Sequence, residues 1–283
     1  MNLAIVILNY NSSEDCRKCV GLLKQQKGIE AEIVVVDNCS NEKDRLAAER
    51  LCREAGCTFI ASTENRGYNA GNNIGLRYAV EKGYTYALIA NPDMEFPQTD
   101  YLAKMLAAIE SDKDIAAVGS DIVGADGHHQ NPFKPDGDWH SAFSWVKWFF
   151  RSSETDFLDD PQLTHYCSKI SGCCLLVRLD FIREIGYFDE NVFLYCEEAI
   201  LTKQVSNAGK KMLYTADCQA IHRHIPSTKG DPVKRFINWR RSRLYFERKY
   251  NYTSFFGWCI TALSWNIYTY TFIAINKLRK LIR

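Results

Sequence analysis

Short apolar runs alternate with longer amphipathic stretches over the first third of the chain. The runs are too short for helices and stop at turn-forming residues, so they predict buried strands, whereas the stretches between them carry apolar residues at helical spacing. Strands that alternate with helices predict an α/β fold whose mostly parallel central sheet has helices on both faces. The predicted strands lie at residues 3–8, 33–36, 58–61 and 86–90, with helices between them at 16–26 and 42–55.

Polar side chains follow three of these predicted strands. Because the carboxyl ends of parallel strands meet at one edge of a sheet, we expect these side chains to line one ligand-binding crevice. Asp93, helped by the Asn91 amide, could hold a divalent cation through oxygen ligands, and such a cation would suit a diphosphate. The alternative is that the strand simply ends in a turn with a solvated Asp93, because Asn, Pro and Asp are common turn residues. The polar groups are Asn9-Tyr10-Asn11, Asp37-Asn38 and Asn91-Pro92-Asp93.

Residues 65–75 hold three glycines and four asparagines. This composition predicts a loop whose backbone N–H groups can approach a phosphate, followed by a helix from Leu76 to Glu81 with its N-terminus toward the anion. Arg66 is a further candidate for contact with the phosphates. The stretch is not a Walker loop, because no Gly-Lys-Ser/Thr follows. A purely structural loop is the alternative interpretation.

The charge balance argues against nucleic acid as a partner. The chain has 35 Lys and Arg against 34 Asp and Glu, so its formal net charge is only +1. Eleven cysteines are scattered and mostly lie in apolar runs, which favours free thiols in a reducing compartment. The first residues lack a basic start and predict a strand rather than a secretion signal, so we expect a cytoplasmic protein.

The segment 231–283 differs from the rest, because it is basic and rich in aromatic residues. Ser254 to Ile275 contains no charged residue and would be long enough as a helix to span a bilayer. Its Ser, Thr and Asn residues, together with its Trp and Tyr, favour one or two helices lying in the membrane interface, with the neighbouring cations drawn to anionic lipid. A helical pair packed on the folded core is the alternative.

The motifs of the first half together resemble the family 2, GT-A type inverting glycosyltransferases, in particular the rhamnosyltransferase-like branch of polysaccharide assembly enzymes. The resemblance covers roughly residues 1–250 and implies a GT-A fold with a Rossmann-like nucleotide-sugar-binding half at 1–95, an acceptor-binding half at 96–230 and a helical appendage at 231–283. The motifs are Asn-Tyr-Asn at 9–11, Val-Val-Asp-Asn at 35–38, Asn-x-Gly-Tyr at 65–68 with Asn73 further on, and Asn-Pro-Asp at 91–93.

The second half supports this resemblance. Gly-Tyr-Phe-Asp-Glu at 186–190, with Phe193, Tyr195 and the acids Glu197 and Glu198, resembles the family's Gly-x-Phe-Asp-Glu and Phe-x-Tyr-x-Glu-Asp block. The second acid of that pair is the general base in the family. The matching residue is Glu198, one methylene longer than the usual Asp, and Glu197 is the alternative base.

Two further sites come from the same resemblance. His222 fits the family's metal-completing histidine better than His224, in a loop that continues to Ser227 and Thr228. Gly172 and Cys173 are small residues that we expect to lie under the acceptor. The resemblance also implies nucleotide contacts from Asn9, Tyr10, Asn11, Asp37, Asn38, Asn65, Arg66, Gly67, Asn73 and Asn91, and metal ligands Asp93 and His222.

The implied function is metal-dependent transfer of rhamnose or a hexose from dTDP-rhamnose or a UDP-hexose to a lipid-linked saccharide, in the synthesis of cell-surface polysaccharide such as O-antigen. The implied cofactor is Mg²⁺ or Mn²⁺, and the implied place is the inner face of the cytoplasmic membrane; a homodimer is left open. One alternative is a sugar nucleotidyltransferase, which would need a Gly-rich basic loop where Asn9 to Ser12 stand. Another is a catalytically inactive membrane-associated protein that binds nucleotide-sugar or glycan.

Overall fold

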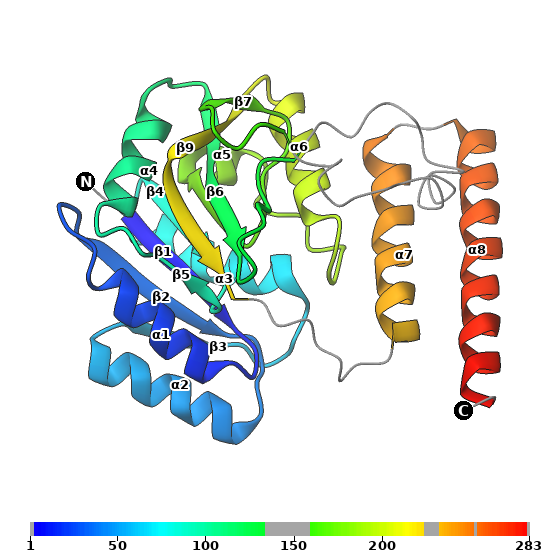
Figure 1. Ribbon diagram of the computed structural model, residues 1–283, viewed down its shortest axis with the longest axis horizontal. Helices are drawn as coiled ribbons and strands as arrows, with labels where there is room; N and C mark the ends of the chain where they lie inside the picture. Colours follow the sequence, from blue (N-terminus) through cyan, green and yellow to red (C-terminus); the bar gives the residue numbers. More distant parts are fainter. Residues whose placement is uncertain (1–2, 134–158, 224–231, 252–253, 282–283) are drawn as a thin grey trace.

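One mixed sheet runs through the molecule in the order β3-β2-β1-β4-β8-β6-β9-β5, with β7 paired to β9 (Figure 1). The computed structural model describes residues 3–133, 159–223, 232–251 and 254–281. Strands β3, β2, β1 and β4 are parallel, as predicted, whereas β8 is antiparallel to both β4 and β6. The strands are β1 (Leu3–Asn9), β2 (Ala31–Asp37), β3 (Thr58–Ala61), β4 (Tyr86–Ala90), β5 (Met94–Glu95), β6 (Ile115–Gly124), β7 (His165–Cys167), β8 (Cys174–Arg178) and β9 (Lys211–His222).

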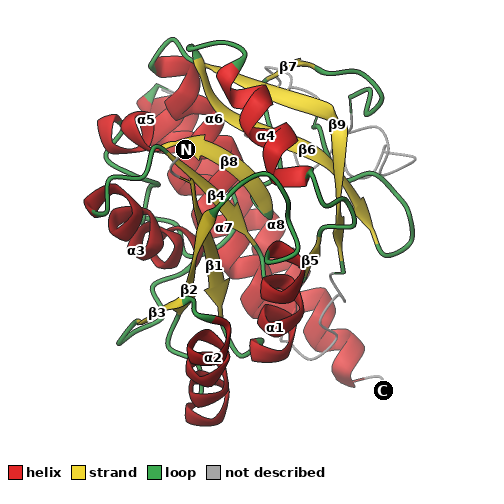
Figure 2. Cartoon of the chain, turned by 90° about the vertical axis from the view of Figure 1, so that its left-hand side faces the viewer, coloured by secondary structure: helices red, strands yellow, loops and turns green. Residues whose placement is uncertain are grey.

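Helices cover both faces of this sheet, which confirms the predicted layering (Figure 2). Ile5 and Ile7 of β1 pack in one core with α1, α2 and α4, whereas Ala4 packs in the core that holds α3, α5 and α6. A strand buried on both faces needs apolar residues at every position, which explains the uninterrupted apolar runs. The helices are α1 (Ser13–Leu23), α2 (Glu42–Ala55), α3 (Tyr68–Glu81), α4 (Tyr101–Glu110), α5 (Leu179–Glu184), α6 (Glu197–Asn207), α7 (Pro232–Tyr250) and α8 (Phe255–Leu281).

Helix α3 begins eight residues earlier than the Leu76 start predicted from the sequence, at Tyr68. The glycines of this stretch serve close packing rather than a flexible loop. A Cβ on Gly71 would lie 2.5 Å from Leu8 Cδ1, and one on Gly75 would lie 2.4 Å from Val6 Cγ1. Close contact of α3 with β1 therefore outweighs the low helix propensity of Gly and Asn. The prediction of a phosphate-binding loop over residues 65–75 is therefore wrong from Tyr68 onward, and only residues 65–67 precede the helix.

The helical appendage stands to one side of the sheet, where α7 and α8 lie alongside each other (Figure 1). Phe246 and Tyr250 of α7 pack on Val192, Ala199 and Ile200, so α7 joins the folded core, as the alternative interpretation predicted. Across the described ranges, every helix falls short of the length or the hydropathy that a bilayer crossing requires.

Candidate active site

The carboxyl ends of β1 and β2 lie side by side, with Asn9 in register opposite Asp37. Both side chains are fully buried. The Asn9 amide donates to the carboxylates of Asp37 (2.8 Å) and Asp44 (2.9 Å), and its oxygen accepts the N–H of Ser12 at 3.1 Å. Asn9 therefore braces Asp37 and the start of α1, and its direct contact with a nucleotide stays a prediction.

The residues after β1 form an exposed but braced loop. Asn11 has a left-handed φ of 56°, and its side-chain oxygen accepts the N–H of Asn41 at 2.9 Å, which closes the loop onto the start of α2. Tyr10 is 53% exposed. An exposed aromatic ring on a braced loop can stack on a nucleobase, which is one way for Tyr10 to make its predicted nucleotide contact.

The loop before α3 is pinned between β2 and the segment that leads to α6. The Asn38 amide donates to Asn65 Oδ1 and to the Gly67 carbonyl, both at 3.2 Å. Gly67 has a φ of +102°, and a Cβ there would lie 2.2 Å from the carbonyl oxygen of Phe193. The N–H of Tyr68 donates to the same oxygen at 2.9 Å. The predicted nucleotide side and the segment leading to α6 therefore share a backbone contact.

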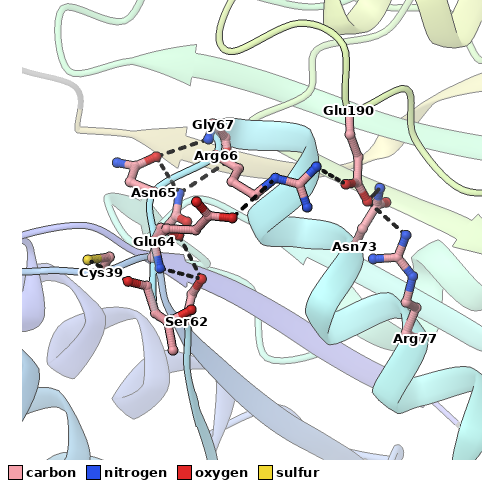
Figure 3. A network of polar contacts seen from close by, with 11 residues as sticks. Cys39, Ser62, Glu64, Asn65, Arg66, Gly67, Asn73, Arg77 and Glu190 are labelled. Atoms are coloured by element: carbon pink, nitrogen blue, oxygen red, sulfur yellow. Dashed lines mark hydrogen bonds and ion pairs between the residues drawn. The ribbon is translucent and has the colours of Figure 1, made fainter.

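Arg66 and Asn73 both contact Glu190 in the structure (Figure 3). The Glu190 carboxylate accepts the Asn73 amide at 2.9 Å and pairs with Arg77 at 2.7 Å and Arg66 at 3.2 Å. Burial alone would raise the pKa of Glu190, but these hydrogen bonds and charges outweigh it and lower the pKa. Asn73 is fully buried and also exchanges hydrogen bonds with the backbone of Phe188. The predicted nucleotide residues Arg66 and Asn73 thus tie α3 to the 186–190 turn.

Asp93 and His222 meet because β5 pairs antiparallel with β9, with Met94 opposite His222. Asp93 Oδ1 lies 3.4 Å from His222 Nε2, and both side chains are at most 21% exposed. His222 Nδ1 lies 2.9 Å from Gln130 Oε1, an oxygen that can only accept, so Nδ1 donates and Nε2 is the nitrogen that faces Asp93. A hydrogen bond donated by the other ring nitrogen is the arrangement that orients metal-bound imidazoles. Gln130 was not predicted as a site residue.

The donor set at this point fits Mg²⁺ or Mn²⁺. One carboxylate and one imidazole leave most coordination positions of such an ion for diphosphate oxygens and water, as is usual where the substrate carries phosphates. Within the described ranges, no group of three or more His, Cys, Asp or Glu residues could hold an ion. The other histidine of this loop, His224, and the pair Ser227 and Thr228 lie outside the described residues.

The two acids predicted as the base begin α6, after a strained turn. Tyr195 and Cys196 both have left-handed backbones, with φ of 74° and 67°. Non-glycine residues in this region cost about 1–3 kcal/mol each and cluster at functional sites. Glu197 Oε2 is buried without a hydrogen-bond partner among the described residues, and burial and the neighbouring Glu198 raise the pKa of Glu197 to about 8. The raised pKa favours the protonated form of Glu197.

A tight turn before β8 brings the predicted acceptor residues next to Glu198. Strand β8 starts at Cys174, which leaves Gly172 and Cys173 in this turn. The N–H of Gly172 donates to Glu198 Oε1 at 3.3 Å, and the Gly172 carbonyl accepts the hydroxyl of Tyr68 at 2.6 Å. Burial raises the pKa of the Tyr68 hydroxyl well above its ordinary value, so this group remains a donor. Tyr68 is a site residue that the sequence-based prediction missed, although it belongs to the Asn-x-Gly-Tyr motif.

Cys173 connects the two predicted centres. Its thiol is almost fully buried, and burial is the main cause of its raised pKa. The charges of Glu198 and Asp93 both raise the pKa of Cys173 further. The Cys173 carbonyl also accepts the N–H of Asn91 at 2.7 Å. The 172–173 turn therefore contacts Glu198 on one side and the segment that carries Asp93 on the other.

Asp189 attaches the appendage to this site. Its buried carboxylate accepts hydrogen bonds from three α7 residues: Tyr245 (2.7 Å), Lys249 (2.9 Å) and Tyr250 (2.6 Å). Its backbone carbonyl accepts the amide of Asn69, next to Tyr68, at 2.8 Å. Burial alone would raise the pKa of Asp189, but these hydrogen bonds outweigh it and hold the pKa well below the ordinary carboxyl range.

Replacing Asp189 by asparagine is expected to lower the free energy of unfolding by about 2 kcal/mol at neutral pH, because three donors lose a charged acceptor. A depressed carboxyl pKa stabilises the fold above the ordinary carboxyl range and loses this effect as the pH falls through the folded-state pKa. The difference between Asp189→Asn and the wild type should therefore shrink in acid. Denaturant titrations at several pH values measure it, with Glu184→Gln, an exposed acid on α5, as the control. Equal stability of Asp189→Asn and the wild type would contradict the assignment.

Comparison with known proteins agrees with this geometry. The glycosyl transferase family 2 model matches residues 4–186. A low-salt glycan biosynthesis hexosyltransferase of Haloferax volcanii is 28% identical over 225 residues, 78% of this chain and 66% of the relative. An N-acetylglucosaminyl-diphospho-decaprenol L-rhamnosyltransferase of Mycobacterium tuberculosis is 22% identical over 284 residues, 94% of this chain and 89% of the relative.

A solved structure shows the same fold. The mannosyltransferase of Pyrobaculum calidifontis, in complex with GDP-Man and Mn²⁺, superposes with a TM-score of 0.61 over 93% of this chain and 69% of its own, at 16% identity. The chain spans about two thirds of this structure and of the Haloferax relative. The family match covers more than half of the chain and includes the ends of β1, β2 and β4. The chain therefore belongs to glycosyl transferase family 2, has the GT-A fold and is a glycosyltransferase with relatives on the rhamnosyltransferase-like branch.

Proposed function

We propose that this glycosyltransferase moves a rhamnose or hexose residue from a nucleoside diphosphate to a hydroxyl of a lipid-linked glycan and inverts the anomeric carbon. The observation that supports this most is the 172–173 turn, which contacts Glu198 through the N–H of Gly172 and accepts the N–H of Asn91, two residues before Asp93, at the Cys173 carbonyl. A base for the acceptor and a cation site for the leaving diphosphate thus lie on the two sides of one small-residue turn. A Mg²⁺ or Mn²⁺ ion bound by Asp93 and His222 would offset the charge that develops on the departing diphosphate.

Glu198 takes the proton of the acceptor hydroxyl as its oxygen attacks the anomeric carbon. The new bond forms on the face opposite the diphosphate, while the bond to the diphosphate oxygen breaks. We assign this role to Glu198 rather than Glu197, because Glu198 contacts the Gly172 turn and the raised pKa of Glu197 favours its protonated form. Tyr68 keeps the Gly172 carbonyl in place and so holds the turn against Glu198. The exposed ring of Tyr10 binds the nucleoside, and the buried Asp37 carboxylate braces the loop beside it through Asn9 and the N–H of Ser40.

The names of the relatives support a choice of donor and acceptor. One relative is named as transferring L-rhamnose to a decaprenol-linked saccharide, and another as a hexosyltransferase of glycan synthesis. We therefore propose dTDP-rhamnose or a UDP-hexose as the donor, a lipid-linked saccharide as the acceptor and cell-surface polysaccharide as the product. An enzyme with such an acceptor works at the inner face of the cell membrane.

Mn²⁺ together with the correct nucleoside diphosphate is expected to stabilise the protein against heat. A ligand that binds only the folded state adds about 2.7 kcal/mol at a hundredfold excess over Kd. Thermal unfolding with dTDP, UDP and GDP, each with and without Mn²⁺, measures this effect. The Asp93→Asn variant should lose the Mn²⁺-dependent part of the shift.

The matched control is Glu81→Gln, which neutralises an exposed acid at the far end of α3. This variant should behave as the wild type does. A nucleotide shift that is the same with and without Mn²⁺ would show that the metal assignment is wrong. No shift with any nucleotide would reject the donor site itself.

A further inference from the structure

The outer surface of α8 carries a continuous apolar stripe. Its side chains recur at alternating spacings of four and three residues, so they share one face of the helix. Each of them is between 53% and 77% exposed. The stripe consists of Phe256, Ile260, Leu263, Ile267 and Tyr270. For the rest of this subsection, "the α8 stripe" means these five residues.

The opposite face of α8, which packs on α7, is the more polar one. Thr261, Ser264 and Thr269 are at most 5% exposed. The hydroxyls of Thr261 and Thr269 donate to carbonyls one turn earlier in the same helix, at 2.8 and 2.7 Å. Trp265 fills the contact with α7, with its ring 4.9 Å from that of Trp239. A surface helix in water has the reverse arrangement, with its apolar stripe inward.

The helices beside this stripe are strongly basic. After Asp231 the sequence contains eleven of the 35 Lys and Arg residues but only one of the 34 acids, Glu247. That acid is fully buried and pairs with Arg243 at 2.6 Å. Among these cations Lys234, Arg241 and Arg248 of α7 and Lys277 of α8 are exposed. Lys277 follows Tyr270 by seven residues and so shares the face of the α8 stripe, and the Arg248 guanidinium lies 5.2 Å from the ring centre of Trp258 on α8. The helical pair is therefore cationic, on a chain whose other residues carry a net negative charge.

We propose that the α8 stripe docks into the interfacial layer of an anionic membrane, with exposed cations of the same two helices at the lipid phosphates. Apolar side chains next to Lys and Arg on one exposed helical surface are the features of helices that lie in the membrane plane. The residues of the stripe would enter the boundary between headgroups and acyl chains, where an aromatic ring such as that of Tyr270 is favoured. Anionic lipid neutralises the exposed cations of the two helices.

A second copy of the chain fits this surface less well. Two copies paired along α8 would place two strongly cationic helical pairs against each other, and the one acid of this segment, Glu247, is buried against Arg243 and could not offset the repulsion. An anionic bilayer supplies both an apolar layer and negative charge. The occupant that matches both properties is therefore the membrane.

The helix behind the stripe contacts the predicted base segment. Ser242 of α7 donates to the carbonyl of Leu194 at 2.7 Å, three residues before Glu197. Docking of α8 would therefore hold the start of α6 at a set distance from the bilayer. This part of the inference rests on the proposed function, since it matters only for a lipid-linked acceptor.

Co-sedimentation of the full chain with vesicles tests the docking. The wild type is expected to pellet with vesicles that contain phosphatidylglycerol and to stay largely in solution with pure phosphatidylcholine. The double variant Leu263→Asn with Ile267→Asn removes two large apolar contacts and should lower the partition coefficient on the order of tenfold or more. The matched control is Leu46→Asn with Leu163→Asn, which changes two leucines that are 44% and 62% exposed elsewhere on the surface. This control should bind vesicles as the wild type does.

The possible outcomes separate the docking from the proposed function. Wild-type protein that stays in solution with anionic vesicles, or binds neutral vesicles equally well, would overturn the proposal, as would a stripe variant that binds like the wild type. A wild-type dimer that the stripe variant converts to a monomer, without vesicle binding, would assign the stripe to a second copy. Nucleotide-dependent thermal shifts of all three proteins report on the donor site separately. These shifts also show whether each variant is folded.

Discussion

Glu198→Gln is expected to lower kcat by about 10²–10⁴-fold, the usual contribution of a positioned general base. The amide keeps the shape of the side chain and the contact with Gly172 but cannot take the proton of the acceptor hydroxyl. Nucleotide-dependent thermal stabilisation should not change, because Glu198 lies on the acceptor side of the turn. Initial rates at saturating donor and acceptor measure the effect. A Glu198→Gln variant with the wild-type rate would reject this residue as the base.

Glu197→Gln is the matched control, since an amide imitates the protonated acid that neutral pH favours here. Its kcat at neutral pH should stay within a few-fold of the wild-type value. Burial and Glu198 raise the pKa of Glu197 to about 8, so the folded protein binds more protons than the unfolded chain below that pH. Wild-type stability should therefore fall as the pH rises from the ordinary carboxyl range toward 8, and Glu197→Gln should remove this fall. Melting temperatures across that range show whether it does.

A protein that binds nucleotide but gives no product with any donor or acceptor would be consistent with the inactive binding protein considered from the sequence. In that case Glu198→Gln and the wild type would have equal, zero turnover. A wild type that turns over and a Glu198→Gln variant that does not would exclude this alternative.

Gly67→Ala is expected to lower the free energy of unfolding by about 3 kcal/mol and to raise KM for the donor. The backbone of Gly67, at φ 102° and ψ −175°, lies in a region that only glycine occupies readily. An added Cβ would also lie 2.2 Å from the carbonyl oxygen of Phe193, where neither group can turn away because both are backbone. Separation of these two segments would displace Tyr68 and loosen the Gly172 turn. Chemical denaturation and donor titrations measure the two effects.

Gly83→Ala is the matched control, because it places alanine in a left-handed backbone without a clash of the added Cβ. Gly83 also has a left-handed φ, +79°, but nothing lies within 4 Å of a Cβ placed there. This control should lose only about 1 kcal/mol of stability and keep its donor KM. If both variants lose the same amount, the contact between Gly67 and Phe193 has no role in holding the site together.

The parts of the fold that depend on local pattern could be predicted from the sequence. β4 and α2 have the predicted bounds, 86–90 and 42–55, because a strand buried on two faces and a helix with one apolar face leave clear patterns. The polar residues at the ends of β1, β2 and β4 were located for the same reason. The start of α3 was predicted wrongly, because glycine and asparagine are rare within helices and the sequence does not show the close contact with β1 that favours them here.

The parts of the site that depend on long-range pairing could not be derived from local pattern. Asp93 and His222 meet through β5, a strand of two residues with no signal in the sequence. Only the family resemblance suggested this pair. Likewise, nothing near Asp189 in the sequence indicates its three partners on α7. The same limit applies to Glu190, whose partners on α3 and in the preceding loop include two residues that had been predicted to bind nucleotide.

The position of β8 determines how the chain unfolds. This strand, from the predicted acceptor half, pairs along the whole of β4 from the predicted nucleotide half, from Tyr86 opposite Arg178 to Ala90 opposite Cys174. The half predicted to bind the nucleotide and the half predicted to bind the acceptor therefore share one sheet. A fragment that ends at residue 95 would leave β4 as an unpaired apolar edge, a structure prone to aggregate. We expect the catalytic core to unfold in a single cooperative transition and the isolated first half to be insoluble.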